Sequence, residues 1–235
     1  MKRLLLLCTA LLFCALTGPA QTVTRPTDPG VSVVAFDLTW EAFTPAKYFI
    51  TVDSSGNAKY VSREKLQLPE PDSKGSASEA TTESEPDFEL SFTMSPANRE
   101  KVFQLAKDTN YFNGSFDYTA HRIADTGKKV LTYADSGRIF QTTYNWSENK
   151  SIDQLTKLFQ GISYTIEHGR KLQFLRRFDK LGLEKELKGM EEAAQSGYMA
   201  EIQIIAPTLE NIANDPAILH IARERARRLL ALNLS

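Results

Sequence analysis

Hydrophobic and polar residues alternate with two different periods along the chain, and the change of period divides it into two parts. Residues 88–94 alternate strictly, which places Phe88, Leu90, Phe92 and Met94 on one face of a predicted strand. Five further segments rich in β-branched and aromatic residues also predict strands: residues 31–40, 48–52, 58–62, 129–133 and 138–144. Glycine-containing turns join the second of these to the third, and the fourth to the fifth, as two hairpins.

A helical spacing of apolar residues occurs once between predicted strands, and from residue 151 onward it is the main pattern. Ser95 and Pro96 predict the start of a first helix that ends near Asp108, because serine suits the N-cap and proline the first helical position. A second helix is predicted from the apolar positions Ile152, Leu155, Leu158, Phe159, Ile162 and Ile166. It can run on to Phe178, with a break at Gly161 or Gly169 left open.

Three more helices are predicted toward the C-terminus. Leu183, Leu187, Met190 and Ala194 define one, and Met199, Ile202, Ile205, Leu209 and Ile212 define the next. Pro207 must kink that helix or begin a new one, because its ring removes a backbone hydrogen bond. Asp215-Pro216 predicts the start of the last helix.

These elements predict an α+β fold, in which an antiparallel sheet of two hairpins and extra strands packs on helices. We place an α+β domain at residues 31–150 and an all-helical extension at residues 151–235, packed on or beside it. Residues 67–87 interrupt the first domain. They are rich in Pro, Ser, Thr and Glu, and residues 67–89 hold seven acids against one lysine, which predicts a disordered acidic loop.

The N-terminus has the pattern of a secretory signal peptide. Lys2 and Arg3 precede an apolar run from Leu4 to Leu16, and a small-residue cleavage site ends at Ala20. That run is shorter than the roughly 20 residues that a spanning helix needs, so we expect export to the periplasm or medium after cleavage, and no later membrane span. A retained anchor is the alternative. Residues 21–30 then form an extended leader.

Composition narrows the possible functions. Hydrophobic residues make up 42% and charged residues 24% of the 235, as in folded soluble proteins. Both cysteines lie in the predicted signal peptide, so the mature chain is expected to have no thiol. Loss of Lys2 and Arg3 would change the net charge from −1 to −3, which gives no reason to expect nucleic acid as a partner.

Two motif runs give the first part a resemblance to a known family. Residues 48–60 form a Tyr-x-apolar-x-apolar strand, a glycine turn and a strand ending in Tyr, and Tyr111-Phe112 is a pair at a helix end. With the second hairpin and the helix after it, residues 31–165 resemble a family of uncharacterised bacterial exported α+β domains. That family usually has a Cys-Pro pair before its Tyr, whereas Pro45 is displaced here and the cysteine is absent. The resemblance implies a hairpin–helix–hairpin–helix fold and no established activity.

Reactive groups are few and lack recognisable spacing. His121 lies between Asp117 and Asp125, and a catalytic or metal role would require oriented carboxylates within hydrogen-bond reach of it. His168 and His220 are expected at the surface or its boundary. The chain contains no Gly-x-Ser-x-Gly elbow, phosphate loop or His-Glu-x-x-His motif. We therefore predict no catalytic, cofactor-binding or metal-binding residue, and no cofactor.

Three functions remain in order of preference. The first is a non-enzymatic, exported module that binds a protein or the cell envelope. The second is a carboxylate-dependent hydrolase around the loop from Asp117 to Asp125. The third is an accessory or inhibitory protein whose acidic loop binds a basic partner. Strand aromatics could bind a peptide or glycan on a free sheet face, but we expect most of them to form the core.

Overall fold

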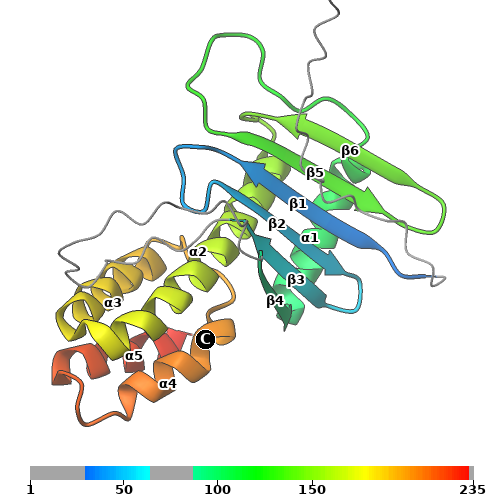
Figure 1. The fold of residues 1–235 in the computed structure, drawn as a ribbon. Helices are drawn as coiled ribbons and strands as arrows, with labels where there is room; N and C mark the ends of the chain where they lie inside the picture. The colour runs from blue at the N-terminus through cyan, green and yellow to red at the C-terminus, as the bar shows by residue number, and fades with distance from the viewer. Residues whose placement is uncertain (1–29, 64–86, 233–235) are drawn as a thin grey trace, which may run out of the picture.

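The computed structural model describes residues 30–63 and 87–232 and confirms the predicted α+β class (Figure 1). Its six strands form one sheet, and its C-terminal part is helical. The predicted signal peptide, the leader as far as residue 29 and residues 64–86, which include residues 67–86 of the acidic loop, lie outside the described residues. Within the described ranges, no helix has both the length and the apolar character needed to cross a membrane.

The sheet is antiparallel throughout, with the strand order β4-β3-β2-β1-β5-β6. Its strands are β1 (Val33–Thr39), β2 (Lys47–Asp53), β3 (Asn57–Ser62), β4 (Phe88–Thr93), β5 (Lys128–Ala134) and β6 (Ile139–Tyr144). In the turn of each predicted hairpin, an aspartate side chain accepts hydrogen bonds from backbone N–H groups. Asp53 Oδ1 accepts the backbone N–H groups of Ser55 and Asn57 at 2.9 Å each, and Asp135 does the same in the second turn.

The two faces of the sheet differ in polarity. The register places the large buried side chains on one face: Val34, Phe36, Leu38, Tyr48, Ile50, Val52, Tyr60 and Leu131. The opposite face carries mainly polar side chains such as Thr51, Lys59 and Gln141. Helices α1 and α2 cover the apolar face and lie behind the sheet in Figure 1.

Helix α1 (Pro96–Asp108) begins as predicted, with Ser95 Oγ accepting the Asn98 N–H at 3.4 Å. Helix α2 (Lys150–Phe178) is continuous over 29 residues, and Asn149 caps it. Its first half packs on the sheet, where the rings of Phe36 and Phe159 stack with centroids 5.2 Å apart. Its second half extends beyond the sheet (Figure 1).

A second core surrounds this second half of α2. The helices around it are α3 (Lys180–Gln195), the short 3₁₀ helix η2 (Ile202–Ile205), α4 (Ala206–Ala213) and α5 (His220–Leu232). We call them, with the end of α2, the helical unit. Its core consists of Leu172, Leu175, Leu183, Leu187, Met190, Ile205, Leu209, Ile212, Ala213, Ile218, Ala222, Ala226 and Leu229. Pro207 begins α4 rather than kinking a longer helix.

The last helix starts later than its sequence predicts. Asp215 and Pro216 lie in a turn, and α5 begins at His220. The Asp215 carboxylate accepts the Ala217 N–H at 3.0 Å and pairs with Arg176 of α2 at 3.2 Å. Ile218 is only 3% exposed, so its burial in the second core also holds this turn in place.

Neither glycine of α2 breaks the helix, because both serve tertiary packing instead. A Cβ at Gly161 would lie 2.8 Å from the Tyr198 carbonyl oxygen, and a Cβ at Gly169 would overlap Cγ2 of Ile205. The two glycines therefore admit the segment 198–205, which crosses α2 at close range.

We expect Gly169→Ala to lower the free energy of unfolding by roughly 2 kcal/mol, because overpacking displaces the Ile205 side chain or the backbone. Adding Ile205→Ala removes the overlapping methyl group, so the double variant should lose at least ~1 kcal/mol less than the sum of the single variants. Urea denaturation followed by circular dichroism measures all three. Gly189→Ala in α3 is the control, because nothing lies within 4 Å of its Cβ, and it should stabilise the protein. Simple additivity would contradict the proposed overlap.

Candidate functional site

An aromatic pocket of about 290 Å³ lies at one end of the sheet, where several segments distant in the sequence meet. Its aromatic lining is Trp40, Phe43, Tyr144, Trp146 and Tyr198. Its polar lining is Thr126, Lys129, Asn145, Ser147, Asp153, Thr156, Lys157 and Gln160. Pockets for small ligands usually combine aromatic walls with a few placed polar groups, and this composition fits that description.

The connection between β1 and β2 supplies the first wall. The Trp40 N–H donates to the Ala46 carbonyl at 2.7 Å, and the Phe43 N–H donates to the Trp40 carbonyl at 3.0 Å. These bonds fold the connection back on itself, and the two rings stack with centroids 5.7 Å apart and planes 7° apart. Contacts within the protein therefore position this first wall.

The end of β6 supplies the second wall. Trp146 follows Tyr144 and Asn145, and its side chain is 42% exposed. The Tyr118 backbone N–H donates to the Trp146 carbonyl at 2.9 Å. The Tyr118 ring packs edge-on against the indole, with ring centroids 5.1 Å apart. A large, exposed indole fixed in this way offers an apolar surface to a partner.

Helix α2 and the segment after α3 complete the pocket. Tyr198 is 38% exposed and packs edge-on against Tyr164 of α2 at 5.2 Å. Gln160 lies on the same helix, and its side-chain amide makes no hydrogen bond with the other described residues, so this amide can bind a ligand. Asp153 and Lys157 form an exposed ion pair at 2.8 Å on the rim.

Lys129 is the one lysine of the pocket that is buried, at 4% exposure. Burial lowers its pKa to about 8, while Asp125 and Asp117 oppose that change. Its ammonium group donates to the carbonyl oxygens of Thr126, Gly127 and Asn145 at 2.6, 3.1 and 2.7 Å. An ammonium group has three donors, so these carbonyls occupy all of them and leave no free amine for chemistry.

The hydroxyl of Tyr144, which also lines the pocket, forms a hydrogen bond within the protein as well. Tyr144 and Thr156 share a hydrogen bond of 2.6 Å, and the Thr156 hydroxyl lies 2.7 Å from the Ile152 carbonyl, to which it donates. Burial raises the pKa of Tyr144, so its phenol stays neutral. These polar groups stabilise the pocket rather than supply an acid, a base or a nucleophile.

The loop from Asp117 to Asp125 borders this pocket, and both of its aspartates accept backbone N–H groups. Asp117 Oδ1 accepts the Asn145 N–H at 2.8 Å, and Asp125 Oδ1 accepts the Gly127 N–H at 2.9 Å. His121 is exposed and packs toward Tyr118, with ring centroids 6.2 Å apart. Neither aspartate forms an ion pair or hydrogen bond with His121 in the described structure. Across the described ranges, no group of three acidic, histidine or cysteine residues could hold a metal ion.

The other two histidines lie on the helical unit. His168 is half-buried, binds Glu186 through Nδ1 and stacks on Tyr164 at 3.8 Å. Burial alone would raise the pKa of Glu186, but hydrogen bonds from His168 and Lys171 lower it. His220 is exposed, 3.7 Å from Glu224. The surface or boundary positions expected for both are confirmed.

Only strand aromatics are considered from the sequence as candidate ligand-binding rings, and the aromatic residues of the connections are missed. The strand aromatics Tyr48, Tyr60, Phe88, Phe92, Phe140 and Tyr144 share the helix-covered face, and Phe49 lies on the other. The pocket instead takes Trp40 and Trp146, each placed one or two residues after a strand. That position was the available signal: both tryptophans follow the last paired residue of their strand, although Trp40 still packs against the sheet core.

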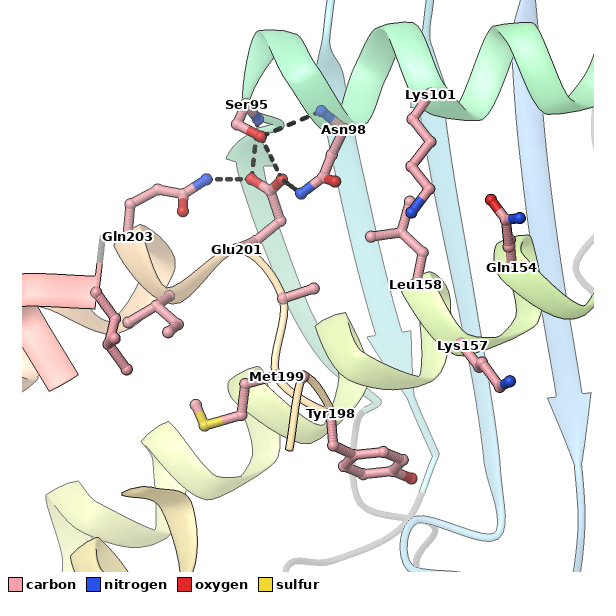
Figure 2. A pocket seen from close by; sticks show the side chains of 14 residues that line it. Ser95, Asn98, Lys101, Gln154, Lys157, Leu158, Tyr198, Met199, Glu201 and Gln203 are labelled. Carbon is pink, nitrogen blue, oxygen red and sulfur yellow. Dashed lines mark hydrogen bonds between the residues drawn. The ribbon is translucent and has the colours of Figure 1, made fainter. Parts of the chain in front are cut away.

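A second cavity, of about 550 Å³, lies between α1, α2 and the segment 197–203 (Figure 2). Glu201 lines this cavity and is 4% exposed. Its carboxylate accepts hydrogen bonds from the Ser95 N–H and hydroxyl at 2.9 and 2.7 Å, from the Asn98 amide at 2.6 Å, and from Gln203. This carboxylate joins the helical unit to the start of α1, so its role is to hold the two cores together.

Neither a family model nor a curated protein matches this sequence. Membership of the exported family that residues 31–165 resemble therefore stays a prediction.

Proposed function

We propose that this protein is an exported, non-enzymatic binding module of the bacterial cell envelope, and that the aromatic pocket holds a neutral ring of an envelope glycan. The proposal rests on one observation: aromatic rings of the pocket are exposed, whereas the polar groups beside them already form hydrogen bonds within the protein. Trp146 and Tyr198 are 42% and 38% exposed at the pocket, whereas Lys129 and Tyr144 beneath them are bound within the protein.

A sugar ring suits these walls. Its C–H face packs on flat aromatic surfaces such as Trp40 and Trp146, and its hydroxyls can bond to the free amide of Gln160 and to the exposed Asp153. An anionic or cationic ligand is less favoured, because the rim charges of Asp153 and Lys157 already neutralise each other.

Tryptophan fluorescence tests this directly, because both tryptophans of the chain line the pocket. We expect saturable quenching or a spectral shift when the mature protein is titrated with a β-1,4-linked N-acetylglucosamine tetramer. Calorimetry should give a matching affinity. Gln160→Ala should weaken binding at least threefold through the lost hydrogen bonds.

Trp146→Ala removes the exposed wall and should weaken calorimetric binding at least tenfold, as interface aromatics commonly do. Phe178→Ala is the matched control, because that ring is exposed at 66% but lies far from the pocket on the helical unit. Equal losses in the two variants, or no binding of the tetramer, would contradict the glycan proposal. Release of new reducing ends that depends on Asp117 or Asp125 would favour the hydrolase alternative.

A further inference from the structure

The helical unit ends in a tip where two connections meet. The α2–α3 and α4–α5 connections lie side by side, because Lys180 Nζ donates to the Ala217 carbonyl at 2.8 Å and Arg176 pairs with Asp215 at 3.2 Å. We call residues 177–181 and 215–221 the distal tip. It is the end of the helical unit that points away from the sheet (Figure 1).

Large apolar side chains stand out from this tip. Phe178 and Leu181 are 66% and 76% exposed, and Leu219 and Ile221 are 44% and 49% exposed. The neighbouring Leu175 and Leu183 already fill the second core at 2% and 0% exposure, so the tip residues are not needed for packing there. A group of such side chains on a protein surface indicates an interaction site.

The free charges around the tip are positive. Asp179 caps α3 by accepting the Gly182 N–H at 2.8 Å, and Asp215 is engaged by Arg176 and by the Ala217 N–H. Arg177 and Lys185 are exposed, and neither has an ion-pair partner among the described residues. The distal tip and the next turn of α3 thus combine protruding apolar groups with two cations, Arg177 and Lys185, that lack an ion-pair partner among the described residues.

We propose that the distal tip docks the protein on an anionic phospholipid surface. Apolar side chains enter the boundary between headgroups and acyl chains, while lysine and arginine meet the phosphates. The tip is a convex corner built from two connections, and a lipid surface accommodates protruding side chains without a matching groove. Docking goes beyond the glycan proposal, because the pocket residue Lys157 and Phe178 are about 30 Å apart along α2.

Vesicle co-sedimentation of the mature protein tests the proposal. We expect binding to vesicles of equal parts phosphatidylglycerol and phosphatidylcholine at low salt, and little binding to phosphatidylcholine alone. Arg177→Gln with Lys185→Gln should weaken it about 25-fold, at roughly fivefold per charge. Phe178→Ser with Leu181→Ser should weaken it at least tenfold by removing the inserting groups.

The control variant, Lys107→Gln with Lys128→Gln, removes the same charge from exposed positions on α1 and β5 and should bind within twofold of the wild type. An equal loss in this control, or equal binding to both vesicle types, would overturn the proposal. So would a dimer that light scattering detects and that Phe178→Ser with Leu181→Ser abolishes, since a second copy would then cover the tip. Trp146→Ala should retain vesicle binding, which separates this result from the glycan test.

Discussion

Replacing Lys129 by methionine is expected to lower the free energy of unfolding by about 2 kcal/mol, since each buried acceptor left without a donor costs roughly 1 kcal/mol or more. The variant removes the donor shared by the carbonyls of Thr126, Gly127 and Asn145, of which the Asn145 carbonyl still accepts the Thr126 hydroxyl at 2.8 Å. Those carbonyls lie where the loop before β5 meets the end of β6. The variant should therefore also change the side of the aromatic pocket that these two segments line. Urea denaturation and the fluorescence titration measure the two effects.

Lys128→Met provides a matched control for this prediction. Lys128 is the preceding residue of β5, and strand alternation turns it to the exposed polar face. Its substitution should change stability by less than about 0.5 kcal/mol. An unchanged stability of Lys129→Met would contradict the structural role of the buried ammonium group.

Chemical modification separates a structural lysine from a reactive one. Because burial lowers the pKa of Lys129 to about 8, a free amine would be acylated quickly at pH 8. Its three carbonyl acceptors and 4% exposure predict the opposite result. Mass spectrometry after brief acetylation of the folded protein should find Lys128 modified and Lys129 protected. Rapid modification of Lys129 would instead favour a catalytic role.

The fold could be predicted because its signals are local. Residues 88–94 alternate strictly and Asp53 and Asp135 close tight turns, so strands and hairpins follow from neighbouring residues alone. The break considered at Gly161 or Gly169 depended on something else. Those glycines admit Tyr198 and Ile205, and only the tertiary structure shows what approaches them.

The aromatic pocket could not be predicted for the same physical reason. Trp40, Trp146 and Tyr198 come from three connections, and nothing in the local pattern indicates which connections converge. Lys129 is also unexpected, because a lysine within a strand normally predicts the solvent face. Its burial depends on carbonyls contributed by two segments, residues 126–127 and Asn145.

Glu167→Ala is expected to destabilise the protein by about 4 kcal/mol, through the loss of one buried carboxylate that joins the sheet to α2. Glu167 is 7% exposed and accepts the Tyr60 and Ser62 hydroxyls at 2.7 and 2.8 Å. It also pairs with Arg170 at 2.7 Å. Removing one partner from a buried charged network typically costs 3–5 kcal/mol. Urea denaturation should show the loss, and Glu210→Ala, at an exposed position on α4, should show almost none.

Two further variants distinguish the charge of Glu167 from the hydrogen bonds it makes. Glu167→Gln keeps an oxygen for Tyr60 and Ser62 but weakens the contact with Arg170, so it should cost only about 1–2 kcal/mol. A triple variant, Tyr60→Phe with Ser62→Ala and Glu167→Met, removes the polar groups together. Because the Tyr60 and Ser62 hydroxyls are removed together with their acceptor, and only the Ser163 hydroxyl loses its 3.1 Å hydrogen bond with Tyr60, it should recover at least half of the stability that Glu167→Ala loses. A triple variant less stable than Glu167→Ala would show that this network contributes net stability rather than compensating for its own burial.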